Sequence, residues 1–162
     1  MDATNEKPTI LVVDDTPGNI DVLSGVLRNE FKVKAALNGK KAIKIAHADP
    51  QPVIILLDIM MPDMDGYEVC QQLKTDPATA QIPVIFITAK NEDKDEKKGL
   101  ELGAVDYITK PINPSIVLAR VHTHLALYDQ NMALEKKVRE RTEELNDTRL
   151  KIIHRLGRAA EF

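Results

Sequence analysis

The chain has little of several features that mark whole classes of protein. Its 162 residues contain no tryptophan and only 4% aromatic residues, so it offers few stacking surfaces for nucleic-acid bases. The single cysteine, Cys70, excludes an internal disulfide and a cysteine metal cluster, and it fits a reducing cytoplasm. The longest apolar run, Val53 to Leu57, is far too short to cross a bilayer. We therefore expect a cytoplasmic protein that contacts neither membranes nor nucleic acid directly.

Apolar and charged residues are both plentiful. Hydrophobic residues make up 43% of the chain and charged residues 29%, which is enough for a packed core under a solvated surface. The net charge is -3, and no part of the chain is basic enough to favour binding to a phosphate backbone. The length suits one domain of ordinary size with an additional segment.

Apolar runs alternate with amphipathic stretches over most of the chain. The expected strands are Thr9–Val13, Phe31–Ala36, Val53–Leu57, Ile82–Ile87 and Val105–Ile108. The expected helices between them are Asn19–Asn29, Gly39–Ala48, Tyr67–Thr75 and Asp93–Leu102. This alternation predicts βαβ units and hence a parallel sheet with helices on both faces. The expected fold class is α/β, a doubly wound five-stranded parallel sheet of the flavodoxin-like order 2-1-3-4-5.

A different pattern begins after Pro114. From Ser115 to about Ala160 there is no proline, and glycine occurs only at Gly157, so one long helix is expected. Apolar residues recur there every seven residues, with a polar residue one heptad earlier, at Val138, Leu145, Ile152 and Asn131. A companion position is mixed, at Leu127, Leu134, Arg141 and Thr148. The pattern favours a parallel coiled coil that makes a homodimer, and the alternative is a monomeric exposed helix.

Acidic residues follow two strands that should be neighbours. Asp14 and Asp15 come directly after the first expected strand, and Asp58 comes directly after the third. One aspartate after a strand is usually a helix cap, but three at adjacent strand ends repel one another unless a cation joins them. Oxygen ligands of this kind suit Mg²⁺ or Mn²⁺.

Two further polar residues follow the remaining strands. Thr88 comes after the fourth expected strand and Lys110 after the fifth. Alone, either side chain would be an ordinary surface group. Beside a metal-bound carboxylate, a hydroxyl and an ammonium group can hold a phosphoryl group, and the carboxylate can act as its acceptor. The sequence therefore predicts Asp58, Lys110 and Thr88 as the residues that carry the chemistry.

These motifs resemble the two-component receiver domain. The resemblance is carried by Asp14-Asp15, by the run from Asp58 to Gly66, by Thr88-Ala89 and by Lys110-Pro111, and it covers about residues 8–127. It implies that a sensor histidine kinase phosphorylates Asp58, the acceptor in a two-component phosphorelay.

The resemblance also implies the remaining roles. Asp14, Asp15 and Asp58 would bind Mg²⁺ together with the backbone carbonyl of Met60. Thr88 and Tyr107 would form a switch pair that alters the surface of the fourth helix, fifth strand and fifth helix, and the Lys110–Pro111 peptide bond would be cis. Met60 cannot hydrogen-bond an attacking water, so we expect slow loss of phosphate.

The end of the chain carries a second resemblance. Residues from Arg141 to Phe162 are similar to the linker that enters an HD-GYP domain, a cyclic-di-GMP phosphodiesterase module. The resemblance implies a receiver over residues 1–127 and a helical coiled-coil linker over 128–162 that leads to an output domain absent from this chain. We expect no phosphodiesterase activity from the chain itself, which would be a signalling switch and not an enzyme.

Two other functions stay open at this point. The chain could be a stand-alone receiver whose long helix binds a partner protein, or a phosphorelay carrier between histidines. The heptad pattern favours the linker, because a simple carrier does not need one. His122 and His124 are two residues apart, so they do not share a helix face, and a metal site there is not expected. Cys70 is expected to be buried and inert beside Val69 and Leu73.

Overall fold

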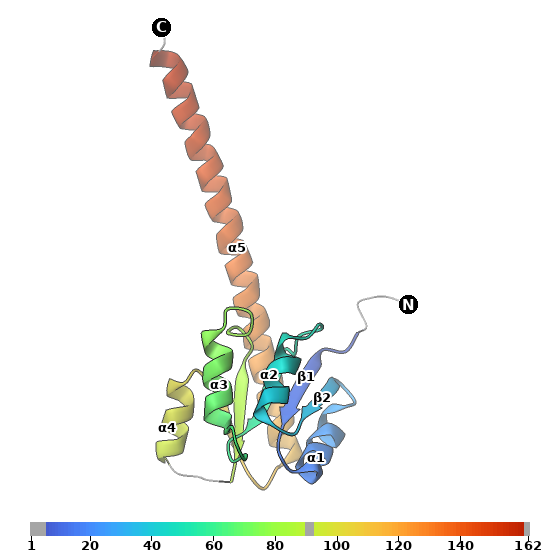
Figure 1. The fold of residues 1–162 in the computed structure, drawn as a ribbon. Helices are drawn as coiled ribbons and strands as arrows, with labels where there is room; N and C mark the ends of the chain where they lie inside the picture. The colour runs from blue at the N-terminus through green and yellow to red at the C-terminus, as the bar shows by residue number, and fades with distance from the viewer. Residues whose placement is uncertain (1–5, 90–92, 161–162) are drawn as a thin grey trace. The chain divides into compact units, whose positions relative to one another are not determined.

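The computed structural model describes residues 6–89 and 93–160, which divide into two units over residues 1–125 and 126–162. Strands and helices alternate through the first unit (Figure 1). The strands are β1 (Thr9–Val13), β2 (Lys32–Ala36), β3 (Ile54–Asp58), β4 (Val84–Thr88) and β5 (Asp106–Thr109). The helices are α1 (Pro17–Leu27), α2 (Gly39–His47), α3 (Gly66–Thr75), α4 (Asp93–Glu101) and α5 (Pro114–Ala160), and α5 continues into the second unit.

The five strands form one parallel sheet in the order β2-β1-β3-β4-β5. This confirms the predicted fold class, a doubly wound flavodoxin-like sheet. Every residue of β1, β3 and β4 is buried, as expected for central strands that are covered on both faces. Because strand side chains alternate between faces, Leu11 and Ile55 lie in one core cluster and Ile10 and Ile54 in the other.

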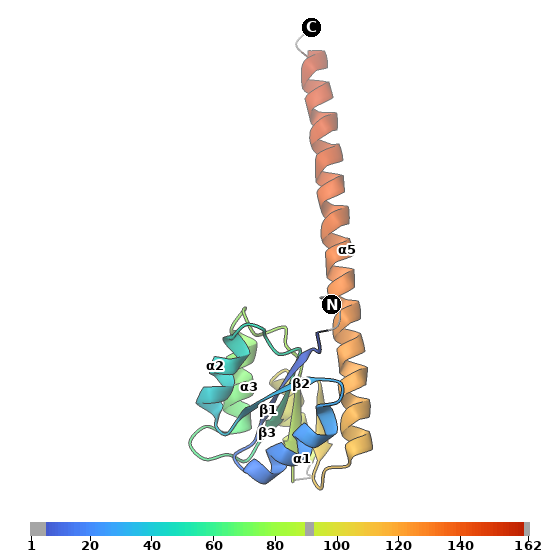
Figure 2. The same ribbon diagram turned by 90° about the vertical axis from the view of Figure 1, so that its right-hand side faces the viewer.

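Helices cover the two faces of the sheet in different pairs. The cluster on one face joins the strands to α2 and α3, through residues such as Ala42 and Cys70. The first turns of α5 and the helix α1 lie at the other face (Figure 2). The cluster there joins them to the strands through Leu23 and Val121. Cys70 is fully buried, as predicted, and burial raises the pKa of its thiol to about 11, which makes it a poor nucleophile.

Several boundaries differ slightly from those predicted. The fourth strand begins at Val84, two residues later than expected, because Pro83 has no backbone N–H to donate to the sheet. The second strand begins at Lys32, because the backbone N–H of Phe31 bonds to Leu27 O in the turn that closes α1. The first helix begins early at Pro17, whose fixed φ suits a first helical position.

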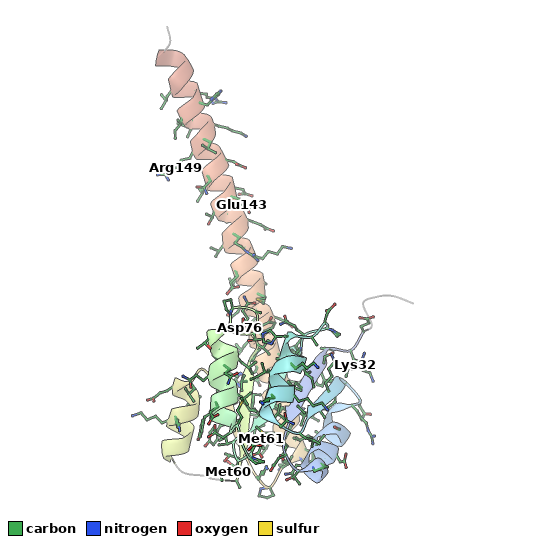
Figure 3. The ribbon with its side chains drawn as sticks, viewed as in Figure 1. Lys32, Met60, Met61, Asp76, Glu143 and Arg149 are labelled. Atoms are coloured by element: carbon green, nitrogen blue, oxygen red, sulfur yellow. The ribbon has the colours of Figure 1, made fainter. Side chains whose placement is uncertain are left out.

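The second unit is helical as far as Ala160. Six of its apolar side chains are 48% to 68% exposed: Leu127, Leu134, Val138, Leu145, Ile152 and Leu156. At about 100° per residue they lie within one narrow stripe along the helix. Side chains such as Glu143 and Arg149 extend outward from the same helix (Figure 3). Among the described residues, no helix combines the length and apolar character that a membrane span requires.

Candidate functional site

Three aspartates meet at the carboxyl edge of the sheet. Asp14 and Asp15 follow β1, and Asp58 is the last residue of the neighbouring β3. Each can offer one carboxylate oxygen, and the three atoms lie within 4.8 Å of one another. Asp14 and Asp58 are buried, at 1% and 4% exposure, whereas Asp15 is exposed. The oxygen-only set fits a hard divalent cation such as Mg²⁺.

Lys110 directly follows the edge strand β5 and brings a positive charge to these carboxylates. Its Nζ lies 3.3 Å from Asp14 Oδ2 and 3.5 Å from Asp58 Oδ1. The Lys110–Pro111 peptide bond is cis, as the family resemblance implied. The backbone N–H of Lys110 donates to Thr88 O over 2.7 Å, which joins the ends of β4 and β5. Among the side chains that the structure describes, Lys110 is therefore the cation that contacts the acidic cluster.

In the absence of a cation, the electrostatics of the cluster make Asp58 keep its proton to a higher pH than an ordinary aspartate does. Burial and the nearby Asp14 carboxylate raise the pKa of Asp58, the Lys110 ammonium opposes them, and the result is a pKa of about 6. Two buried carboxylates with one lysine thus leave negative charge only partly compensated. A divalent cation at this position would remove the imbalance.

Thr88 and Tyr107 lie on adjacent strands next to this edge. Thr88 ends β4 and is buried at 1% exposure, and its strand pairs with β5 so that Phe86 stands opposite Tyr107. Tyr107 is half-buried and packs against the core cluster on the α2 and α3 face. A Cβ atom added to Gly99 of α4 would lie 2.8 Å from the Phe86 ring and 3.7 Å from the Tyr107 ring. Helix α4 therefore packs closely against β4 and β5 at this point, with the backbone of Gly99 next to the Phe86 ring.

The segment between β3 and α3 shapes the rim of the site. Met60 is 58% exposed at the rim, while Met61 is largely buried (Figure 3). Asp63 adopts a positive φ of 67°. Gly66 begins α3, one residue before the expected helix start, and a Cβ atom there would collide with the backbone carbonyl of Asp58. The need for glycine thus comes from a close approach of two backbones and not from an unusual turn angle.

The sequence-predicted residues therefore fall into two groups. The structure brings together Asp14, Asp15, Asp58, Lys110 and the end of β4 at Thr88. It places Tyr107 and Met60 next to this group, on β5 and on the rim. Asp58 and Thr88 were expected directly after their strands, but each strand runs one residue further and ends at the site residue itself.

Comparison with known proteins decides the family. Residues 10–122 match the family model of the response regulator receiver domain. The chain belongs to this family. It is 44% identical over 160 residues to a Vibrio cholerae protein named "Probable cyclic di-GMP phosphodiesterase", covering 94% of this chain and 36% of that protein. It is 48% identical over 115 residues to the response regulator PleD of Caulobacter vibrioides, covering 70% of this chain and 25% of PleD.

Solved structures agree with this assignment. The response regulator DrrB of Thermotoga maritima, an OmpR/PhoB homolog, superimposes with a TM-score of 0.67 at 36% sequence identity. That match covers 74% of this chain and 53% of the DrrB chain. The receiver chain therefore spans about a third or less of the curated relatives named above, at 36% and 25% of their lengths.

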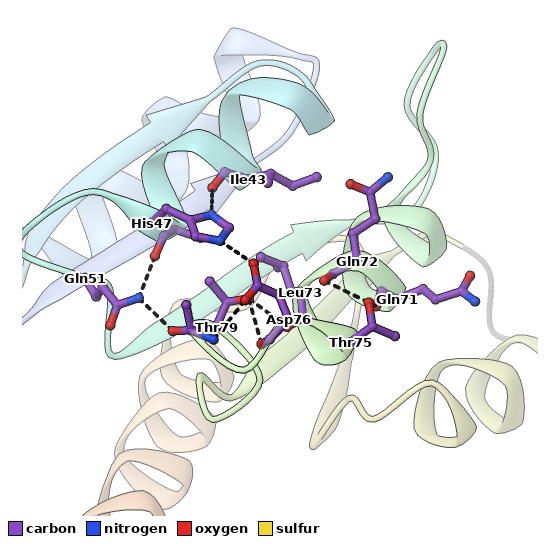
Figure 4. Close-up of polar contacts among 11 residues, drawn as sticks. Ile43, His47, Gln51, Gln71, Gln72, Leu73, Thr75, Asp76 and Thr79 are labelled. Atoms are coloured by element: carbon purple, nitrogen blue, oxygen red, sulfur yellow. Dashed lines mark hydrogen bonds and ion pairs between the residues drawn. The ribbon is translucent and has the colours of Figure 1, made fainter.

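The receiver also contains a polar network far from the acidic edge. His47 Nε2 of α2 lies 2.6 Å from Asp76 Oδ2, just after α3 (Figure 4). The amide of Gln51 donates to the backbone carbonyls of Ala46 and Ala78. The carbonyl of Ile43 and the Asp76 carboxylate raise the pKa of His47. The backbone N–H of Ala78 and the His47 ring lower the pKa of Asp76. These hydrogen bonds pair polar groups near the ends of α2 and α3 and hold the two helices together, which is a structural role.

Sequence reasoning missed one cluster in the receiver. Asp106, the first residue of β5, contacts Arg120 and His124 of α5. His122 points to a different partner, Glu30, over 3.0 Å. The separate partners agree with the expectation that the two histidines do not act together. No local sequence signal identifies Asp106, because its partners are more than a dozen residues away along the chain.

Proposed function

We propose that this receiver is the phosphorylation switch of a two-component system, with Asp58 as the residue that a sensor histidine kinase phosphorylates. One observation carries the proposal: two buried carboxylates, Asp14 and Asp58, converge with Lys110 Nζ at 3.3 Å and 3.5 Å. A buried group of like charges with one cation is costly for folding. Such a site is worth keeping for a function that uses the charges.

Asp14, Asp15 and Asp58 would hold Mg²⁺, or Mn²⁺, with the Met60 carbonyl as a further ligand. The fit rests on three carboxylate oxygens within 4.8 Å, a donor set that suits hard cations. When bound, the cation would neutralise carboxylate charge and attract the oxygens of an incoming phosphoryl group. Asp15 is exposed, so the cation would keep contact with water on that side.

The phosphoryl transfer would use the residues in three roles. A carboxylate oxygen of Asp58 attacks phosphorus, a new P–O bond forms, and the P–N bond to the kinase histidine breaks with its electron pair left on the imidazole nitrogen. With a pKa of about 6, Asp58 is mostly ionised at neutral pH and ready to attack. Lys110 donates to the phosphoryl oxygens, and the Thr88 hydroxyl adds a hydrogen bond. The chain would catalyse only its own phosphorylation and dephosphorylation.

Phosphorylation would act by shifting a conformational population. Thr88 would move toward the phosphoryl group and Tyr107 would turn inward, which changes the surface made by α4, β5 and α5. Support comes from the placement of both residues on adjacent strands behind the acidic edge. Because α5 runs as one helix from Pro114 to Ala160, a change at its base can reach residues 128–162.

The receiver would occupy residues 1–127, and the output domain would follow the helical linker. The exposed apolar stripe supports a homodimeric coiled coil over residues 128–162. We further propose that the protein acts in the cytoplasm without direct contact to nucleic acid or membrane. The similarity to the Vibrio cholerae protein spans 160 residues and so includes this segment. The name of that protein supports a cyclic-di-GMP phosphodiesterase as the output domain of a longer regulator. The linker resemblance over Arg141 to Phe162 is the reason for proposing the HD-GYP type.

Intact-protein mass spectrometry after incubation with acetyl phosphate and Mg²⁺ tests the phosphorylation site. We expect one phosphoryl adduct on the wild type, none on Asp58→Asn, and one on Asp63→Asn. Asp63 is the matched control, because it lies on the rim loop and belongs to no part of the cluster. The proposal fails if Asp58→Asn acquires the same adduct as the wild type, or if folded wild type acquires none.

A further inference from the structure

The carboxylate of Asp106 joins the strand that carries Tyr107 to α5. Its Oδ1 accepts hydrogen bonds from the Tyr107 backbone N–H at 2.8 Å and from Arg120 Nη1 at 2.7 Å. Its Oδ2 lies 2.7 Å from Nε2 of His124. Both oxygens of one side chain therefore connect the switch strand to the fifth helix.

The link is well shielded from solvent where it meets the histidine. The side chains of Asp106 and His124 are only 18% and 14% exposed. Burial alone would raise the pKa of Asp106, but the hydrogen bonds from Arg120 and His124 bring it below the usual value. Charge-assisted hydrogen bonds in such an environment are short and strong. Asp106 is therefore held in one position by its helix partners.

Arg120 and His124 are one helical turn apart on α5, so they present the same face to Asp106. Leu125, the next residue, ends the first unit. The link thus acts on the last turn of α5 that belongs to the receiver, immediately before the segment proposed to carry the signal.

A second histidine–carboxylate pair on α5 has no connection to the switch strand. His122 contacts Glu30, in the turn between α1 and β2, and its ring lies 6.0 Å from that of Phe31. This pair is about half exposed, at 51% and 50%. It holds the same stretch of helix but from an element that carries none of the site residues, and it therefore serves as an internal control.

We propose that Asp106 is a positioning residue for the output: it transmits movement of β5 at Tyr107 to α5 through Arg120 and His124. The inference rests on the proposed signalling through α5 and deepens it. When the backbone at Tyr107 moves, the Asp106 carboxylate moves with it and draws the bonded turn of the helix. Without the carboxylate, Tyr107 would still respond to phosphorylation, but α5 would not follow.

Distances between two spin labels on one chain test this link. Labels on Lys44→Cys in α2 and Glu140→Cys in α5 occupy exposed positions, and Cys70 is too deeply buried to react. Dilution into excess unlabelled chain isolates the intrachain distance. The distance is measured before and after acetyl phosphate and Mg²⁺ in the wild type, Asp106→Asn, His124→Leu and His122→Leu. Mass spectrometry records the adduct on each, and thermal unfolding confirms that each is folded.

We expect phosphorylation to shift the distance in the wild type and in His122→Leu. The shift should be lost in Asp106→Asn and in His124→Leu, which has no group to bond Asp106, although both acquire the adduct. Asparagine can still accept from the Tyr107 N–H, so a loss of shift would not reflect a disordered strand. An undiminished shift in Asp106→Asn would overturn the role of Asp106 alone. No shift in fully phosphorylated wild type would overturn this inference together with signalling through α5.

Discussion

The two units of the chain use leucine and isoleucine in opposite ways. In residues 1–125 they fill two clusters on the faces of a sheet, and the central strands are completely buried. In residues 126–160 they form an exposed stripe on a single helix. The first unit has a core of its own, so it can hold the charged side chains of Asp14 and Asp58 at a buried site. Among its described residues the second unit has no buried side chain, and an exposed apolar stripe of this kind suits association with another chain.

Matched leucine substitutions give the largest expected contrast between the units. Leu56→Ala removes a fully buried side chain from β3 and should lower the free energy of unfolding by about 2–5 kcal/mol. Leu145→Ala removes a side chain that is 68% exposed and should change it by less than about 0.5 kcal/mol at dilute concentration. Urea unfolding at low protein concentration measures both. Equal losses would show that residues 126–160 fold against the receiver core.

Leu145→Ala should also weaken self-association, whereas the control substitution Lys136→Ala on the same helix should not. Lys136 is exposed and lies outside the apolar stripe, so it controls for the loss of any α5 side chain.

Gly66→Ala should damage the first unit at its site. The added Cβ would collide with the Asp58 carbonyl and lie 2.8 Å from Ile59 Cα, and both are backbone atoms that cannot turn away. We expect a loss of about 2 kcal/mol in stability, together with slower phosphorylation. Gly25→Ala, where a Cβ would meet nothing within 4 Å, is the control. Thermal unfolding and the rate of adduct formation measure the two effects, and equal behaviour of both variants would refute the account of Gly66.

Asp58→Asn should stabilise the metal-free receiver. Burial and Asp14 raise the pKa of Asp58 from 3.8 to about 6, so the folded state binds more protons than the unfolded state between these values. The stability that Asp58 contributes is present at low pH and declines as pH rises through this window. After allowance for solvent screening, the variant should gain about 1–2 kcal/mol at pH 7.5 in a chelator. Denaturant titrations from pH 4 to 8 measure the difference.

Mg²⁺ provides the complementary control for that effect. It should stabilise the wild type more than Asp58→Asn, because the variant offers one carboxylate fewer to the cation. Identical responses to Mg²⁺ would remove Asp58 from the proposed set of metal ligands.

Met60→Asn should give the smallest effect. An amide at this exposed rim position could hydrogen-bond a water that attacks the aspartyl phosphate, which Met60 cannot do. One hydrogen bond of about 1 kcal/mol corresponds to roughly a fivefold faster loss of phosphate. The decay of the phosphoryl adduct by mass spectrometry measures the rate, with Met60→Leu as the apolar control. An unchanged rate in Met60→Asn would show that the side chain at position 60 does not limit the loss of phosphate.

The fold could be predicted because each central strand is marked in the sequence by its own continuous apolar run. The continuous apolar runs of β1, β3 and β4 indicated strands buried on both faces, and all three are completely buried. The boundaries were less accurate where a backbone hydrogen bond decides them. Pro83 and Phe31 are apolar and looked like strand residues, but one lacks a donor and the other donates to α1.

The site was predictable to the extent that topology brings strand ends together. The parallel order places residues after β1, β3, β4 and β5 at one edge, so five residue positions could be identified without knowledge of distances. Asp106 was missed because it stands at the opposite end of its strand and its partners come from α5. The close approach at Gly66 was missed because it depends on how the segment between β3 and α3 returns to the backbone of Asp58 and Ile59 at the end of β3.

Sedimentation velocity of the chain before and after phosphorylation tests most directly whether the second unit reports on the first. We predict that the dissociation constant for self-association changes several-fold when wild type is treated with acetyl phosphate and Mg²⁺, and stays constant for Asp58→Asn under the same conditions. The same dissociation constant for phosphorylated and unphosphorylated wild type would contradict the account, and the exposed stripe of α5 would then be a constitutive contact independent of Asp58.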